Sequence, residues 1–178
     1  RSVLLGPNGA GKTSLLRTLI GALPPLGGQV RWSGRTLDEL SERERASRMA
    51  FAAPRPLDAA DFTVEHLALL GRVAARGAFA APTRADHDQV NRALAQVGLE
   101  ALRHRTLAGL SDGERQLAQI ARALAQEAGT LVLDEPAASL DWSRQCALMA
   151  MLGRLAGAGQ AIVMSTHDPN HALALADQ

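Results

Sequence analysis

The feature that most constrains this chain is a glycine-rich run near its start, placed between a short apolar segment and a second segment whose apolar residues have helical spacing. Residues 6–13 read GPNGAGKT and fit the pattern G-x-x-x-x-G-K-[ST]. In that pattern the glycines let backbone N–H groups turn toward phosphate oxygens, and the following helix points its positive end at the same anion. The lysine reaches the outer phosphates, and the threonine hydroxyl is available to Mg²⁺. We therefore predict a nucleotide-phosphate site formed by Gly6, Pro7, Asn8, Gly9, Ala10, Gly11, Lys12, Thr13 and Ser14.

Composition adds weight to this prediction. Lys12 is the only lysine among the 19 basic side chains of the chain. A bias toward arginine is most simply an effect of genome composition, so a surviving lysine raises the question of what an ammonium group does there that a guanidinium cannot. Arginine is bulkier and presents a planar fork, whereas lysine is a compact point charge that fits a phosphate loop.

Charge and hydropathy exclude several classes of protein. A net charge of +1, with 47% hydrophobic and 21% charged residues, is ordinary for a soluble globular protein and leaves no basic footprint, so no nucleic-acid partner is expected. Cys146 is the only cysteine, which excludes an intrachain disulfide. No apolar run approaches the roughly 18 residues that cross a bilayer. The length suits one domain. The sequence does not begin with methionine, and its first residues look like the second half of an apolar strand, so we expect it to be clipped at both ends.

Strand-like and helix-like patterns alternate along the chain, which predicts an α/β fold with a mostly parallel sheet flanked by helices. Strands are expected at residues 2–5, 29–34, 49–53, 130–133 and 161–165, and the exposed strand at 29–34 is expected to end in a turn. Helices are expected at residues 14–20, 35–48, 63–70, 85–97, 113–126 and 141–155, and the helix at 35–48 is expected to be solvated because it mixes both charge signs. The alanine-rich stretch 74–81, which carries a glycine and ends before a proline, is expected to be a loop.

Two carboxylates follow the apolar run of residues 131–133. Asp134 and Glu135 lie at the end of this predicted buried strand, which is where open α/β sheets bind ligands. Asp134 is suited to the Mg²⁺ shell, and Glu135 to orienting or deprotonating an attacking water. The alternative is a strand end with acidic residues for solvation, which the nearby phosphate loop disfavours.

A second helix start looks suited to phosphate. Residues 110–114 read LSDGE and open a long predicted helix, with Ser111 as its apparent N-cap and Gly113 leaving room for a phosphate to approach. A single phosphate loop uses only one helix N-terminus, so a second helix start of this kind needs another explanation.

Together these motifs resemble the ATP-binding cassette (ABC) family, whose signature usually reads LSGGQ. The resemblance covers essentially the whole chain. GPNGAGKT is similar to the Walker A loop, LVLDEP to Walker B, and LSDGE to the signature. Residues 139–141 are similar to the family's D-loop, and residues 165–168 are similar to the switch that carries the family's histidine. The family is an ATPase family with a P-loop NTPase fold that uses ATP and Mg²⁺.

The resemblance also implies roles for individual residues. In the family two subunits pair head to tail, and ATP lies between the phosphate loop of one and the signature of the other, here Ser111, Gly113 and Glu114. His167 would contact the γ-phosphate and act with Glu135 in catalysis. Asp141 would communicate across the interface. Thr13 and Asp134 would hold Mg²⁺.

The family's domain organisation carries over in the same way. Residues 1–178 are expected to form a single nucleotide-binding domain. Within it, residues 1–53 and 129–178 would form the RecA-like core, and residues 54–128 a helical subdomain that carries the signature helix.

One family residue is absent. The family has a glutamine after the strand predicted at 49–53, where it contacts Mg²⁺ and couples ATP to the partner; here Pro54 or Arg55 takes its place, and arginine cannot coordinate a cation. We expect slow but measurable hydrolysis, because Glu135 and His167 remain. The aromatic residue on which adenine stacks in the family would lie upstream of Arg1.

The family resemblance leaves three functional classes open. The first is an ATPase that energises a transporter at the cytoplasmic face of the plasma membrane, with permease subunits on other chains. Within it, residues 61–72 and 165–177 resemble importers of iron-siderophore, haem or cobalamin, and residues 55–72 would receive the permease's coupling helix. The second class is a soluble ABC ATPase that acts outside transport. The third is a nucleotide-binding regulatory subunit with weakened catalysis.

Several other residues have simpler interpretations. His167 and His171 read as H-D-x-x-H, but we favour the switch histidine over a metal site because no third ligand is apparent and Pro169 disrupts the helix start. Trp142 is expected either at the subunit interface or in the core. The remaining predictions are surface positions for His66, His87 and His104, core positions for Met149, Met151 and Met164, and an inert helix position for Cys146.

Overall fold

The centre of the protein is a four-stranded parallel sheet with the strand order β1-β6-β5-β4. The computed structural model describes residues 1–54, 61–76 and 80–177. Strand β1 spans Ser2–Leu5, β4 Met49–Ala52, β5 Thr130–Asp134 and β6 Ala161–Thr166. The two inner strands, β5 and β6, are largely buried, as expected when helices cover both faces of a parallel sheet.

The register of the strands decides where the motifs meet. Leu5 of β1 pairs with Thr166 of β6, and Asp134 of β5 pairs with Ser165 of β6. Because the strands are parallel and in register, their C-terminal ends lie along one edge of the sheet. The glycine-rich loop, the acidic pair and the switch histidine all follow these ends, so the fold brings them to the same edge.

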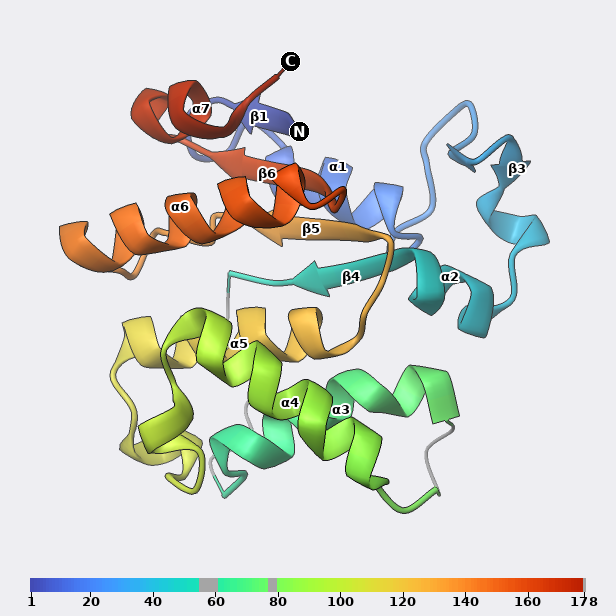
Figure 1. Ribbon diagram of the computed structural model, residues 1–178. Helices are drawn as coiled ribbons and strands as arrows, with labels where there is room; N and C mark the ends of the chain where they lie inside the picture. The colour runs from blue at the N-terminus through green and yellow to red at the C-terminus, as the bar shows by residue number, and fades with distance from the viewer. Residues whose placement is uncertain (55–60, 77–79, 178) are drawn as a thin grey trace.

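Four helices accompany the strands of this sheet. Helix α1 spans Lys12–Leu19, α2 Glu42–Arg48, α6 Trp142–Gly157 and α7 Pro169–Leu175. Helix α1 contacts β5 and β6, α6 contacts β6, and α7 contacts β1 and β6. In Figure 1, α7 lies beside β1 at the top of the view, and α6 runs between α7 and the helices below β4, where it also contacts α4.

Helices α3, α4 and α5 form a separate layer on the other side of β4 (Figure 1). They span Val64–Arg76, Arg84–Val97 and Asp112–Ala125. Helix α5 packs against β4 as well as against α3 and α4. Helices α3 and α5 approach closely at Gly71, where a Cβ atom would lie 2.2 Å from the carbonyl oxygen of Arg122. The division into a core and a helical subdomain at about residues 54 and 128 stays a prediction.

The segment 29–48 differs from the expected strand and solvated helix. Strands β2, Arg31–Trp32, and β3, Arg35–Thr36, form a short antiparallel hairpin. Its turn residues Ser33 and Gly34 have φ values of 51° and 81°, as a tight hairpin turn requires. A 3₁₀ turn follows at residues 37–39, and α2 starts only after Ser41, which caps it. The mixed charges suggested one helix, but turn and capping chemistry divide the segment.

The expected loop at 74–81 is wrong in its first part, because α3 continues to Arg76. Alanine has the highest helix propensity, so an alanine-rich stretch extends a helix that is already packed. Residues 77–79 lie outside the described residues. The other predicted strands and helices are confirmed close to the expected residues, and 3₁₀ turns at 100–102 and 107–109 connect α4 to α5.

The hydrophobic core lies between the sheet and the helices and includes α3, α4 and α5. Fully buried large side chains include Leu67, Leu94, Ile120, Leu131, Leu133, Leu152, Ile162 and Met164. Met151 and Met164 are buried as predicted, whereas Met149 is only partly buried. The core alternative for Trp142 is wrong, because this side chain is 71% exposed. His66 and His104 are on the surface, His87 is partly exposed, and Cys146 is exposed on α6.

Candidate nucleotide-binding site

The glycine-rich loop ends on a helix start that is open to an anion. Gly9 and Gly11 have φ values of 82° and 88°, which a residue with a Cβ rarely adopts. Gly11 is the N-cap of α1, so no side chain caps this helix, and its first turn carries no acidic residue. No side chain of the described residues accepts from the first backbone N–H groups of α1, so these donors are available to an anion, as an anion site requires.

Lys12 is held by the loop and by the acidic pair. Its Nζ donates hydrogen bonds to the carbonyl oxygens of Gly6, at 2.7 Å, and Pro7, at 3.0 Å. The same ammonium lies 3.0 Å from Oε1 of Glu135, and both side chains are mostly buried. The cation is thus positioned at the mouth of the loop by weak neutral acceptors and one carboxylate.

Glu135 connects Lys12 to the switch histidine. Its Oε2 lies 2.7 Å from Nδ1 of His167, so one carboxylate faces a cation and an imidazole at once. The φ of Glu135 is 49°, in the left-handed region, which is uncommon for a residue with a side chain and is often found at functional sites. The two predicted catalytic residues are therefore in direct contact.

Asp134 has the character of a cation ligand. Its side chain is fully buried at the end of β5, and its Oδ1 accepts a hydrogen bond from the hydroxyl of Ser165 at 2.6 Å. Its Oδ2 is buried with no partner among the described residues. A buried, unpaired carboxylate oxygen is costly, and oxygen is the donor that Mg²⁺ prefers. The donor set of Asp134 and the Thr13 hydroxyl therefore fits Mg²⁺.

The signature lies at the start of α5, apart from this cluster. Ser111 caps the helix by accepting from the N–H of Glu114 at 3.3 Å, while Oε2 of Glu114 accepts from the N–H and the hydroxyl of Ser111, both at 2.9 Å. These bonds lower the pKa of Glu114, with Arg144 and Arg105 lowering it further against the opposing effect of burial. Glu114 is therefore ionised.

The signature contacts the D-loop of its own chain. A Cβ atom at Gly113 would lie 2.9 Å from the carbonyl oxygen of Ser139, so only glycine allows this approach. Arg144 lies 3.6 Å from both Glu114 and Asp141, and Asp141 caps α6. Within the described ranges, no hydrogen bond or ion pair joins Ser111, Gly113, Glu114 or Asp141 to the phosphate loop.

Two hydroxyl residues of the site were not singled out from the sequence. Ser165 contacts both members of the acidic pair. Thr166 accepts from the N–H of Asp168 at 3.1 Å and lies 3.3 Å from Nδ1 of His171. The available signal was the position of two polar residues in a strand that is otherwise apolar.

The switch turn also corrects one argument from the sequence. Pro169 does not disrupt a helix; it is the first residue of α7, with Asp168 as the N-cap, because proline's fixed φ suits this position. His167 precedes the helix, and His171 is buried inside it. Across the described residues, no group of three or more histidine, cysteine, aspartate or glutamate side chains is arranged to hold a metal ion.

Pro54 follows β4 and is partly buried, and Arg55 lies outside the described residues. Whether either residue replaces the missing glutamine stays a prediction. No helix in the described parts of the chain has the length and apolar character needed to cross a membrane.

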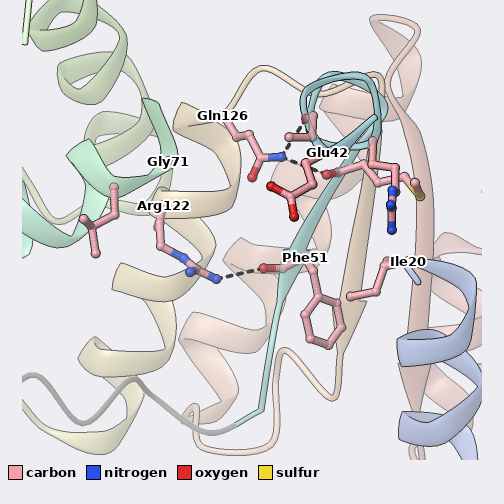
Figure 2. A pocket seen from close by; sticks show the side chains of 10 residues that line it. Ile20, Glu42, Phe51, Gly71, Arg122 and Gln126 are labelled. Atoms are coloured by element: carbon pink, nitrogen blue, oxygen red, sulfur yellow. Dashed lines mark hydrogen bonds between the residues drawn. The ribbon is translucent and has the colours of Figure 1, made fainter. Parts of the chain in front are cut away.

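A separate cavity of about 340 Å³ lies between the sheet and the helical layer. Figure 2 shows the side chains that line it, which come from α2, β4, α3 and α5 and from the residues that directly follow α1 and α5. They are Ile20, Glu42, Arg45, Ala46, Met49, Phe51, Leu70, Gly71, Arg122 and Gln126.

Arg122 is the unusual residue of this cavity. Its Nη2 donates to the carbonyl oxygen of Phe51 at 3.0 Å, its Nε is buried without a partner, and no carboxylate in the described parts of the chain pairs with it. Burial lowers the pKa of its guanidinium. Gln126, one helical turn after Arg122, donates instead to the carbonyl oxygens of Ala46 and Met49.

Comparison with known proteins agrees with this geometry. The family model described as "ABC transporter" matches residues 1–138. The chain is 37% identical over 174 residues to an uncharacterized ABC transporter ATP-binding protein of Haemophilus influenzae, covering 98% of this chain and 66% of that protein. It is 39% identical over 183 residues to the hemin import ATP-binding protein HmuV of Bradyrhizobium diazoefficiens, again covering 98% and 66%.

Solved structures give the same result. The fold is similar to that of a metal-chelate type ABC transporter in an inward-facing conformation, with a TM-score of 0.83, 31% identity, and coverage of 98% of this chain and 66% of that one. A dimeric bacterial ABC transporter cassette aligns with a TM-score of 0.83 and 26% identity, covering 97% and 77%. The chain spans slightly less than two thirds of the length of the first curated relatives it matches. On its motifs, its parallel sheet and these matches, the chain belongs to the ABC transporter family and has the family's P-loop NTPase fold.

Proposed function

We propose that this chain binds and hydrolyses ATP as a subunit of a membrane transporter, paired head to tail with a second copy at the cytoplasmic face of the plasma membrane. The observation that carries the proposal is the contact of Lys12, Glu135 and His167 beside the uncapped start of α1. Relatives named as ATP-binding proteins and a dimeric cassette among the similar structures support it.

Binding of ATP would use the loop and Lys12. The backbone N–H groups of the loop and of α1 would surround the β-phosphate, and Lys12 would move its ammonium from the carbonyl oxygens of Gly6 and Pro7 to the outer phosphates. The phosphates supply stronger acceptors than the two carbonyl groups, so this exchange favours binding.

Thr13 and Asp134 would hold Mg²⁺ through the threonine hydroxyl and the unpaired Oδ2 of the aspartate. When bound, the ion would neutralise negative charge on the phosphates of the nucleotide. Asp134 is suited to this because its carboxylate is already fixed by Ser165.

Hydrolysis would use Glu135 and His167. Glu135 would orient a water molecule and accept its proton as the water oxygen bonds to the γ-phosphorus; the bond to the β–γ bridging oxygen breaks, and ADP leaves with that electron pair. His167, held 2.7 Å from Glu135, would contact the γ-phosphate oxygens. The signature residues Ser111, Gly113 and Glu114 of the second copy would close over the nucleotide, with Asp141 at the interface.

For the transported compound we propose haem or another iron chelate, with cobalamin as the remaining member of the class. The support is indirect: several relatives near 39% identity are named hemin import proteins, and one similar structure is named a metal-chelate type transporter.

We propose that the cavity around Arg122 receives a segment of the permease. Residues 55–72 are the stretch expected to receive it; residues 55–60 lie outside the described residues, but Leu70 and Gly71 line this cavity. A buried guanidinium without a carboxylate partner is costly, so the complementary segment would supply an acidic side chain or the C-terminal carbonyl groups of a helix.

Two measurements test the function. The first is ATP hydrolysis with and without the cognate permease, where stimulation by the permease is expected; a chain that neither co-purifies with a polytopic membrane protein nor responds to one contradicts a transport role. The second is Arg122→Met, which should weaken association with the permease at least about tenfold while leaving basal hydrolysis intact. Arg92→Met, on the exposed side of α4, is the matched control.

The missing glutamine favours one second candidate, a regulatory subunit that binds nucleotide with little turnover. Pro54 and Arg55 offer no amide oxygen at this position. Slow hydrolysis above the level of Glu135→Gln supports the ATPase; turnover equal to that of Glu135→Gln supports the regulatory subunit.

A further inference from the structure

We propose that Ser165 is a positioning residue that orients both carboxylates of the site, Asp134 for the cation and Glu135 for the reacting water. The inference rests on the proposed nucleotide function. Ser165 lies on β6 opposite Asp134 in the strand register and is fully buried. Its hydroxyl is shielded from solvent and, among the described residues, forms hydrogen bonds with Asp134 and Glu135 and none with the phosphate loop, so it would act through these two carboxylate residues.

The hydroxyl of Ser165 is both a hydrogen-bond donor and a hydrogen-bond acceptor. It donates its single proton to Oδ1 of Asp134 at 2.6 Å and accepts the backbone N–H of Glu135 at 3.0 Å. A serine hydroxyl has one proton to give, so donation to Asp134 leaves its lone pairs for the N–H of Glu135. One buried group thereby orders two consecutive residues of the site.

The hydrogen bond from Ser165 determines which carboxylate oxygen of Asp134 is available to a cation. With Oδ1 occupied by Ser165, the carboxylate plane is fixed and Oδ2 is left as the buried, unpaired donor. Groups that orient a metal ligand through a hydrogen bond commonly change metal affinity or activity roughly 10- to 100-fold when they are removed. Without the hydroxyl, Asp134 could turn or exchange its two oxygens.

The effect on Glu135 is on its backbone. Its φ of 49° is a conformation that a residue with a side chain adopts only when its surroundings hold it there. The hydrogen bond from its N–H to Ser165 is such a restraint, at the residue whose carboxylate meets Lys12 and His167. Loss of this bond would let the backbone relax and move the carboxylate away from His167.

The test compares Ser165→Ala with Ser165→Thr. Ser165→Ala removes the hydroxyl and should raise the Mg²⁺ concentration needed for half-maximal binding of a fluorescent ATP analogue roughly 10- to 100-fold. Binding of the same analogue in excess EDTA should stay within about twofold, because the loop and Lys12 are untouched. The kcat for hydrolysis should fall by a comparable factor with less change in KM. Ser165→Thr keeps the hydroxyl and should keep the Mg²⁺ requirement within about threefold.

The control is Thr130→Val, at the far end of β5, whose side chain makes no hydrogen bond in the described parts of the chain. It should leave all three measurements unchanged. If Ser165→Ala does not fold, Ser165→Cys, which retains only a weak donor, takes its place with the same expected direction. A Mg²⁺ requirement within twofold of the unmodified chain for either variant overturns the inference.

The failure of this inference is distinguishable from that of the proposed function. A chain that binds nucleotide in a Mg²⁺-dependent way but never hydrolyses it contradicts the ATPase alone, because the role of Ser165 is still measured by binding. Conversely, unchanged binding and turnover in Ser165→Ala contradict the positioning role while the ATPase stands.

Discussion

The N-termini of α1 and α5 are both candidate phosphate sites, and they are built in opposite ways. Helix α1 begins at Gly11 in the left-handed conformation, with no side-chain cap and no acidic residue in its first turn. Helix α5 begins at Ser111 with a complete capping box, and its first turn carries Asp112 and Glu114. At α1 no side chain of the described residues accepts from the first N–H groups, whereas at α5 the side chains of the capping box accept from two of them, those of Ser111 and Glu114.

This difference indicates an order of events. An anion meets unused N–H groups and Lys12 at α1, whereas at α5 it meets two carboxylates and a hydroxyl that already donates to Glu114. Helix α5 alone is therefore a poor anion site. A nucleotide already bound to a second copy, whose charge is partly neutralised, is the more suitable partner for it.

The largest expected effect on nucleotide binding concerns α1. Lys12→Ala should weaken nucleotide binding about 100-fold, because it removes the charged donor that the outer phosphates would use. Lys12→Arg should not restore binding, since the planar guanidinium does not fit where a compact ammonium lies between Gly6 and Pro7. Calorimetric titration with Mg-ATP measures both. Binding within about threefold of the unmodified chain for Lys12→Ala would remove the contrast between the two helix starts.

The same lysine allows a chemical check. Lys12 is the only lysine, so an amine-reactive reagent should label only Lys12 and the amino terminus. Mg-ATP should protect Lys12 from this labelling. Labelling of Lys12 that does not change with nucleotide would argue against its role in the phosphate loop.

Glu135→Gln sharpens the comparison by separating catalysis from binding. Hydrolysis should fall about 100- to 1000-fold, because a general base is lost, while ATP binding is retained. Phosphate release under single-turnover conditions is the measurement. The control is Glu114→Gln, at the other helix start. An equal loss of hydrolysis in both variants would mean that Glu135 does not act as the general base.

Glu114→Gln has its own expected effect. Glutamine at this position keeps the capping box but removes a negative charge beside the second copy's nucleotide. In a Glu135→Gln background, ATP-driven pairing should tighten about fivefold, and less at high salt. Sedimentation velocity measures it, with the exposed Glu100→Gln as control. Unchanged or weaker pairing would show that the charge of Glu114 does not oppose closure.

The smallest effect is expected from Ser111→Ala, which should cost about 1 kcal/mol of folding free energy through the lost N-cap. Thr83→Ala, in the equivalent capping box of α4, should cost a similar amount. Only Ser111→Ala should also weaken pairing. Thermal unfolding and sedimentation separate the two effects, and equal pairing in both variants would contradict a role for Ser111 at the interface.

The same variant has a pH signature. The bonds from Ser111 hold the pKa of Glu114 below its ordinary value in the folded chain. Its contribution to stability is therefore present above the ordinary pKa and is lost as the pH falls through the folded pKa. In Ser111→Ala the pKa of Glu114 should rise only part of the way toward its ordinary value, because the backbone N–H of residue 111 still donates to Glu114 and only the hydroxyl is lost. Carboxylate NMR titration detects this rise.

The phosphate loop, Asp134 and Glu135 could be predicted from the residue pattern, because each lies at or just after the end of a strand of a parallel sheet. His167 could be predicted from the resemblance of residues 165–168 to the family's switch. Ser165 could not, because its role depends on pairing with Asp134, 31 residues away. The cavity was also missed, since Arg122 meets Phe51 across 71 residues. The turn at Ser33 and Gly34 was expected, but the returning strand β3 was missed because the mixed charges of residues 35–48 were interpreted as one helix.

By itself the sequence determined the local chemistry: a loop whose glycines permit positive φ, a single lysine within it, and a helix start without a cap. These features depend only on neighbouring residues and backbone sterics, so they can be read from the sequence alone. The tertiary structure decided how the motifs combine. Strand register sets which buried hydroxyl orients which carboxylate, and helix packing sets which arginine has no carboxylate partner within residues 1–54, 61–76 and 80–177. Such pairings arise only when the chain closes its long-range contacts.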